Sequence, residues 1–92
     1  MKKSESFSKK SDPNYWANQF TIRLRNMMDE GGIGNTELGA YVGVGKSAVT
    51  AWKKGTSQPN IDRLEKIAEF FHVSIDYLIG RTDDPTLGLY DE

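Results

Sequence analysis

The stretch Ile33–Gly55 constrains the fold of this 92-residue chain most strongly, because two short amphipathic segments flank a turn marked by glycines. Their apolar spacing predicts one helix over residues 35–42 and a second over residues 46–54. Gly43 falls where such a turn needs a positive φ angle. Gly39 costs about 1 kcal/mol in helix propensity relative to alanine, which indicates that a neighbouring helix approaches it closely. The two helices are therefore expected to form one unit that presents the second helix to a partner.

Apolar residues also recur at helical spacing before and after this unit. A first helix is expected over about residues 12–30, with Asp12 as its N-cap and two glycines at its end. A helix over residues 61–71 follows the unit, and Ser74 then caps a short helix that Gly80 stops. Because no alternating strand pattern occurs, the sequence predicts a compact all-α fold of about five helices.

The apolar face of each expected helix defines the core. Val44 lies in the turn, and its side chain is expected to pack into the core between the two central helices. Ile22 lies off the apolar stripe of the first helix and is expected to be partly exposed. The expected core residues are Trp16, Phe20, Leu24, Met27, Met28, Leu38, Tyr41, Val42, Val49, Trp52, Leu64, Ile67, Ala68, Phe71, Ile75, Leu78, Ile79 and, in part, Tyr77.

The chain divides into three parts by composition. Residues 1–11 are rich in lysine and serine and too polar to fold alone, so they are expected to form a flexible basic arm. Residues 12–80 contain all the expected helices and form the domain. Residues 81–92 are acidic and interrupted by proline and glycine, which is typical of a tail or a linker. The apolar side chains of this last part are Leu87, Leu89 and Tyr90.

Composition excludes several classes of function. The chain has no cysteine, so it has neither a disulfide nor a thiolate metal site, and this fits a reducing cytoplasm. Its apolar runs are far shorter than a membrane span, and no hydrophobic segment of a secretory signal follows the N-terminal lysines. His72 is the single histidine and has no cluster of metal ligands around it. We expect a cytoplasmic, non-enzymatic protein without a metal, a cofactor or an evident small-molecule site.

Charge is distributed unevenly along the chain. Residues 1–60 carry nine lysines and arginines against five acidic residues, whereas residues 61–92 carry three against eight. The net charge of the whole chain is −1, so the total says little about a partner. A basic front half favours a polyanion on that side, although ordinary surface charge accounts for the same difference.

Five motifs in register resemble the Cro/CI-type (XRE-like) helix-turn-helix domain of phage and bacterial repressors. They are the Phe-x-x-x-Leu pair at Phe20 and Leu24 and the segments Glu37–Val44, Ser47–Gly55, Pro59–Ala68 and Val73–Gly80. The resemblance covers about two thirds of the chain. It implies a compact five-helix, lambda-repressor-like fold in which the second helix of the unit enters the major groove of DNA by its first residues.

The resemblance also assigns roles by position. Asn35, at the start of the helix over residues 35–42, matches a family position that hydrogen-bonds a phosphate, and the helix dipole supports that contact. The side chains expected at base edges are Lys46, Ser47, Thr50 and Ala51. The side chains expected at phosphates, which fix orientation rather than sequence, are Asn35, Lys53, Lys54, Thr56 and Ser57.

Several positions depart from the family pattern. Lys53 and Met28 stand where the family often has a glutamate and the arginine that pairs with it. Both members of the pair are replaced, so neither charge is left buried alone, which would be costly. Glycine also precedes each helix of the unit, at Gly34 and Gly45, where a better capping residue is usual.

Two functions are compatible with these features. The first is a sequence-specific transcriptional regulator, a repressor of phage or bacterial type, that binds a double-stranded pseudo-palindromic operator as a homodimer. The alternative is a protein-interaction module or antitoxin-like partner. That module would use the acidic surface of the last two helices together with the C-terminal segment Leu87–Tyr90.

Overall fold

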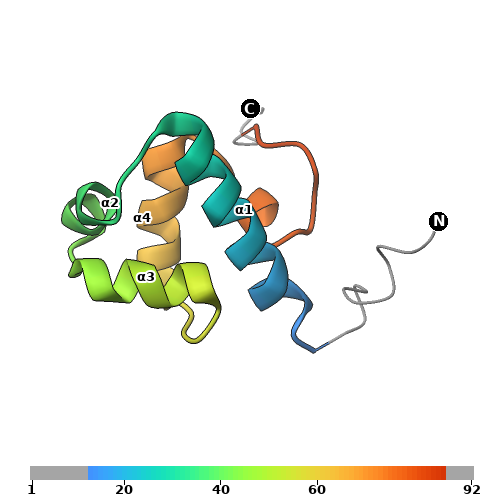
Figure 1. The fold of residues 1–92 in the computed structure, drawn as a ribbon. Helices are drawn as coiled ribbons and strands as arrows, with labels where there is room; N and C mark the ends of the chain where they lie inside the picture. Colours follow the sequence, from blue (N-terminus) through green and yellow to red (C-terminus); the bar gives the residue numbers. More distant parts are fainter. Residues whose placement is uncertain (1–12, 87–92) are drawn as a thin grey trace.

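The computed structural model describes residues 13–86, and these residues form an all-α domain without strands (Figure 1). The expected all-α, five-helix fold class is confirmed over this range. The helices are α1 (Tyr15–Gly31), α2 (Asn35–Val42), α3 (Lys46–Lys54), α4 (Ile61–Phe71) and α5 (Ile75–Leu78).

The helices pack around one core. α2 packs against α3 and α4, α1 packs against α3 and α5, and α4 contacts α5. α3 lies across the lower side of the domain in Figure 1, with α2 at one end and α1 at the other. The buried apolar residues are Phe20, Leu24, Met28, Leu38, Val42, Val49, Trp52, Leu64, Ile67, Ala68, Val73 and Leu78. Most of the expected core is therefore confirmed.

Two large side chains expected in the core are exposed instead. Trp16 is 38% exposed because it lies in the first turn of α1, one turn before the first buried residue, Phe20. Tyr41 is 46% exposed and lies across the surface of α4. Its ring packs 5.1 Å from that of Phe70, and its hydroxyl donates to the Glu69 carboxylate at 3.0 Å, so the polar end stays outside the core.

The remaining expected core side chains are intermediate in exposure. These are Met27, Val44, Phe71, Ile75, Tyr77 and Ile79, and all pack against the buried cluster. Ile22 is 42% exposed, as its place off the apolar stripe predicts.

The helix ends follow local chemistry, with one correction. Ser74 caps α5 as expected, because its side chain accepts from the backbone N–H of Tyr77 at 3.0 Å. Asn60 caps α4 in the same way, since its side chain accepts from the backbone N–H of Arg63 at 2.9 Å. α1 begins at Tyr15 with Asn14 as its N-cap, so the expected start at residue 12 is wrong. The first backbone hydrogen bond of this helix runs from the Asn18 N–H to the Asn14 carbonyl at 3.0 Å, so the helical hydrogen bonds begin after Asn14. Residue 12 itself lies outside the described residues.

The described residues after α5, up to residue 86, stay on the domain. The Arg23 guanidinium of α1 donates to the carbonyls of Tyr77 at 2.8 Å and Thr82 at 2.7 Å, and to the Asp83 carboxylate at 2.7 Å. The Ser74 N–H donates to the Pro85 carbonyl at 3.2 Å. We therefore propose that the domain continues past residue 80 to at least residue 86. The arm, residues 1–11, lies outside the described residues, as do residues 87–92. Among residues 13–86 no helix has the length and apolar character needed to cross a membrane.

Candidate nucleic-acid interface

The turn between α2 and α3 is fixed by a close backbone contact at Gly39. A Cβ atom at this position would lie 2.7 Å from the carbonyl oxygen of Val44. The Gly39 carbonyl accepts from the N–H groups of both Gly43 and Val44, at 2.8 and 2.9 Å. Gly43 has a φ of 93°, as the turn requires. The expected close approach at Gly39 is confirmed, but the approaching group is the backbone of the turn and not a neighbouring helix.

The inner face of α3 is anchored in the core. Val49 is fully buried and Trp52 is 3% exposed, so the expectation that both point inward is confirmed. Thr21 of α1 donates its hydroxyl to the Trp52 carbonyl at 3.1 Å. These contacts from two sides fix which face of α3 is turned outward.

The side chains expected at base edges lie on that outward face. Lys46 and Ser47 are exposed in the first turn of α3, whereas Thr50 and Ala51 are half-buried one turn later. The Thr50 hydroxyl donates to the Lys46 carbonyl at 3.0 Å and accepts from the Asn35 amide at 2.9 Å. Lys46 and Ser47 are thus the two most accessible of the four.

Asn35 joins the two helices of the unit. Its amide nitrogen donates to Thr50, and its amide oxygen accepts from the Lys53 ammonium at 3.0 Å. The structure therefore brings Asn35, the first residue of α2, together with Thr50 and Lys53 of α3. Sequence reasoning missed this network, and the departure of Lys53 from the family pattern was its only signal.

The family often has a glutamate at the position of Lys53 and an arginine, its partner, at the position of Met28. The second of these two positions is apolar here. Met28 is 1% exposed and is part of the core, and no charged or polar residue is buried among residues 13–86. The Lys53 ammonium instead reaches the half-buried Asn35. This arrangement leaves the positive charge of Lys53 at the junction of α2 and α3.

The other side chains expected at phosphates lie at the end of α3. Lys53 and Lys54 occupy its last turn, where a cation is favoured by the helix dipole. Lys54, Thr56 and Ser57 are exposed, and the Thr56 hydroxyl donates to the Ala51 carbonyl at 3.4 Å. α3 and the loop after it thus carry cations at both ends of the helix and no acidic residue from residue 46 to residue 60.

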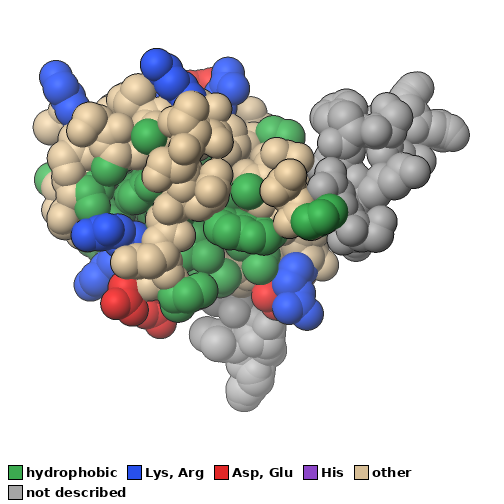
Figure 2. Space-filling model, turned by 90° about the horizontal axis from the view of Figure 1, so that it is seen from below, with side chains coloured by type: hydrophobic (Ala, Val, Ile, Leu, Met, Phe, Trp, Pro, Cys, Tyr) green, Lys and Arg blue, Asp and Glu red, His purple; other side chains and the backbone are tan. Residues whose placement is uncertain are grey.

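Figure 2 views the molecule from the lower side of Figure 1, where α3 and the loop to α4 lie. Lysine and arginine side chains stand around the rim of this face, and acidic side chains are few and lie at its edge. Apolar side chains gather near its centre. This face therefore combines basic edges with an exposed apolar surface.

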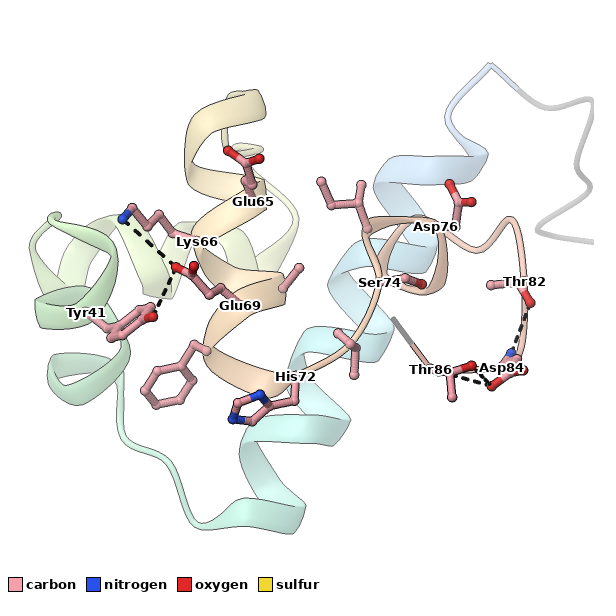
Figure 3. A pocket seen from close by; sticks show the side chains of 14 residues that line it. Tyr41, Glu65, Lys66, Glu69, His72, Ser74, Asp76, Thr82, Asp84 and Thr86 are labelled. Atoms are coloured by element: carbon pink, nitrogen blue, oxygen red, sulfur yellow. Dashed lines mark hydrogen bonds and ion pairs between the residues drawn. The ribbon is translucent and has the colours of Figure 1, made fainter. Parts of the chain in front are cut away.

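A second surface is acidic, in contrast to the basic edges of the α3 face. A hollow of about 1080 Å³ separates α4 from the segment of residues 74–86 (Figure 3). Its lining includes the carboxylates of Glu65, Glu69, Asp76 and Asp84. The hydrogen bond to Glu69 raises the pKa of the Tyr41 hydroxyl at one edge of the hollow, since the bond favours the protonated phenol.

A tight glycine turn, a helix anchored by Val49 and Trp52, and an outward face with exposed cations define a helix-turn-helix domain. The family model described as "Helix-turn-helix" matches residues 24–78, more than half of the chain. The chain therefore belongs to the helix-turn-helix family of the Cro/CI (XRE-like) type. Members of this family are DNA-binding domains of transcriptional regulators and not enzymes.

Three similar proteins are transcriptional regulators. The cryptic phage CTXphi transcriptional repressor RstR of Vibrio cholerae is 31% identical over 64 residues, which are 70% of this chain and 58% of that protein. The uncharacterized HTH-type transcriptional regulator YobD of Bacillus subtilis is 32% identical over 63 residues, 68% of this chain and 56% of YobD. The HTH-type transcriptional activator BcrR of Enterococcus faecalis is 28% identical over 69 residues, 75% of this chain and 34% of BcrR.

The matched region thus spans a little over half the length of the first two relatives and about a third of the last. No solved structure gives a significant match.

Proposed function

We propose that this domain binds DNA in a sequence-specific manner and reads the major groove with α3. The observation that carries the proposal is that Val49 and Trp52 fix the inner face of α3 while Lys46 and Ser47 stay exposed at its start. A lysine can donate to the O6 and N7 acceptors of guanine, and a serine can pair with several bases. Thr50 and Ala51 lie one turn further along and would contact a thymine methyl or a sugar.

The phosphate contacts would surround this helix. Lys53 is positioned by Asn35 at the junction of α2 and α3, and Lys54 lies beside it at the end of α3. Thr56 and Ser57 are exposed in the loop that follows. The lysines of residues 1–11 would add further contacts of the same kind. Such contacts supply affinity that depends on salt, while the base contacts supply the sequence preference.

The protein would bind as a homodimer to a pseudo-palindromic operator with half-sites about 34 Å apart. Large apolar side chains that stay exposed outside α3 support a self-association surface. Ile61 is 71% exposed at the start of α4, and Trp16 is 38% exposed at the start of α1. Sedimentation analysis with and without operator DNA tests whether the protein forms a dimer. A DNA motif selected by such a dimer is expected to be symmetric.

The regulator would act as a repressor. One relative of 31% identity is a phage repressor, and a second relative, of 28% identity, is an activator. A reporter gene placed downstream of the selected operator measures the direction: repression is expected, and activation would overturn this part of the proposal.

Selection of bound sequences from a random duplex pool tests DNA recognition itself. An enriched motif, bound more tightly than scrambled DNA at constant salt, is expected. Binding without any enriched motif would limit the domain to non-specific contacts, and absence of binding would contradict the proposal.

A second function is favoured by the hollow beside α4. Its four carboxylates suit a basic peptide of a protein partner, which would make the domain an interaction module as well as, or instead of, a DNA reader. Glu65→Gln with Asp76→Asn should then weaken capture of such a partner and leave DNA affinity unchanged. A DNA affinity that changes as much as the partner affinity would contradict this assignment.

A further inference from the structure

Thr50 lies on the part of α3 that faces outward. It comes three residues after Ser47 and four before Lys54, and residues at these spacings are neighbours on a helix surface. Ser47 and Lys54 are exposed, and Thr50 between them is half-buried. The Asn35 amide of α2 reaches the Thr50 hydroxyl at 2.9 Å. Thr50 therefore belongs both to the outward surface of α3 and to the polar network that joins α2 to α3.

The donor and acceptor roles in this network are fixed from one end. An ammonium group can only donate, so Lys53 requires the oxygen of the Asn35 amide, which it meets at 3.0 Å. The amide NH2 group then donates to the Thr50 hydroxyl oxygen, which must accept. The hydroxyl proton is left to donate to the Lys46 carbonyl at 3.0 Å, one turn back in α3. The chain of hydrogen bonds thus runs from Lys53 through Asn35 and Thr50 to Lys46.

This chain of bonds limits what Thr50 can offer to a base. Its hydroxyl proton is in use, so it cannot donate to the acceptors of guanine, to N7 of adenine or to O4 of thymine without breaking the bond to Lys46. One lone pair of the oxygen remains, and it would serve only a donor group of adenine or cytosine. The other branch of the side chain is the Cγ2 methyl group. A threonine methyl can pack against the C5-methyl group of thymine.

We propose that Thr50 determines specificity through its methyl group and reads a thymine, and that Asn35 positions it for this contact. The inference rests on the proposed function, because it requires α3 to lie in the major groove. It narrows the assignment made there, since the contact of Thr50 is to a base and not to a sugar, and this base carries a methyl group at C5. The contribution of Thr50 to the sequence preference is therefore apolar, whereas Lys46 and Ser47 contribute hydrogen bonds.

Replacement of each thymine of the selected operator by deoxyuridine tests the contact, because deoxyuridine lacks only the C5-methyl group. The affinity of the protein of residues 1–92 is measured for each duplex at constant salt. At the thymine that Thr50 contacts, affinity should fall about fourfold, the size expected when burial of one methyl group is lost.

Two variants of Thr50 separate the methyl group from the hydroxyl. Thr50→Ser keeps the hydroxyl and lacks the methyl, so it should bind the thymine and uracil duplexes equally at that position. Thr50→Val keeps a methyl in place and lacks the hydroxyl, so the fourfold ratio should persist. Each ratio compares two duplexes bound by the same variant, so a smaller folded fraction cancels.

The outcomes distinguish this inference from the proposed function. A uracil penalty that persists in Thr50→Ser, or that disappears in Thr50→Val, overturns the methyl contact. A selected operator in which every thymine tolerates uracil overturns it as well. In each of these cases sequence-specific binding by the domain still stands, whereas a selection without any enriched motif overturns both.

NMR spectra of the free protein provide a readout that needs no DNA. The side-chain amide resonances of Asn35 should shift in Thr50→Val, because their acceptor is removed, and should change much less in Thr50→Ser. Equal shifts in the two variants would contradict the chain of hydrogen bonds and overturn the inference.

Discussion

The amide oxygen of Asn35 accepts a hydrogen bond of 3.0 Å from the ammonium of Lys53, so the first residue of α2 is joined to the last turn of α3. The same amide group donates to Thr50 at 2.9 Å. These bonds span the turn at Gly43 and add a polar connection to the apolar contacts of Val49 and Trp52. Their effect is to fix both the angle of α3 and the direction of the Lys53 side chain.

Replacement of Asn35 by alanine should therefore lower stability and DNA affinity together. Loss of two half-buried hydrogen bonds is expected to reduce the free energy of unfolding by about 1–2 kcal/mol. Urea denaturation measures this loss, and Thr36→Ala at the neighbouring exposed position is the control. In a double-mutant cycle, Asn35→Ala and Lys53→Ala should couple by about 0.5–1.5 kcal/mol. Additive effects would show that the bond contributes nothing.

Lys46 and Lys54 should have separable effects on DNA binding because they lie at opposite ends of α3. Lys46→Ala is expected to relax the preference at one base position and to cost about 1–3 kcal/mol on the preferred operator. Lys54→Ala should weaken binding equally on all sequences and reduce the slope of log K against log salt by about 1. Titrations of both variants on the selected operator and on a scrambled duplex measure these effects. If the two variants behave alike, α3 does not read the groove in the proposed orientation.

Gly39→Ala should destabilise the domain although alanine is the better helix former. The gain in helix propensity is about 1 kcal/mol. The added Cβ would lie 2.7 Å from the Val44 carbonyl, a backbone group that cannot rotate away, and the strain of such overpacking is about 1–3 kcal/mol. We expect a net loss in chemical denaturation. Gly45→Ala is the control, because a Cβ there meets nothing within 4 Å, and a stabilised Gly39→Ala would contradict the close contact.

Apolar spacing predicted which face of each helix points toward the core, but not how far along the helix that face is buried. Phe20 and Leu24, like Val49 and Trp52, are buried because they lie in the middle of helices that other helices cover. Trp16 and Tyr41 follow the same spacing and are nevertheless exposed. Periodicity gives the direction in which a side chain points, whereas burial also requires a neighbouring element at that height.

In the candidate site, too, local sequence patterns predicted some features and missed others. The positions of Lys46 and Ser47 on an outward helix face follow from local spacing and from the family resemblance, and their contacts with DNA stay a prediction. The bond between Asn35 and Lys53 joins residues 18 apart in sequence, and the bonds of Arg23 reach 54 to 60 residues along the chain. Such contacts depend on the packing angle of helices and on the path of the C-terminal segment, which single-residue patterns do not contain.

The last described turn makes stability depend on pH through Asp84. The Thr86 hydroxyl donates to the Asp84 carboxylate at 2.7 Å and the Thr86 N–H at 3.0 Å, and these bonds lower the pKa of Asp84 because they favour its charged form. A carboxyl group with a lowered pKa in the folded state contributes stability that is fully present above its ordinary, unfolded pKa. That contribution is lost as the pH falls through the lower, folded value.

Thr86→Val should raise the pKa of Asp84 toward its ordinary value, because the variant removes the hydroxyl that makes the largest contribution to the shift. Titration of the carboxyl carbon by NMR between about pH 2 and 6 measures the change. Thr82→Val is the matched control, since the Thr82 hydroxyl accepts from the backbone N–H of Asp84 and does not touch the carboxylate. A shift of equal size in both variants would assign the lowered pKa to the fold of the segment as a whole instead of to the Thr86 hydroxyl.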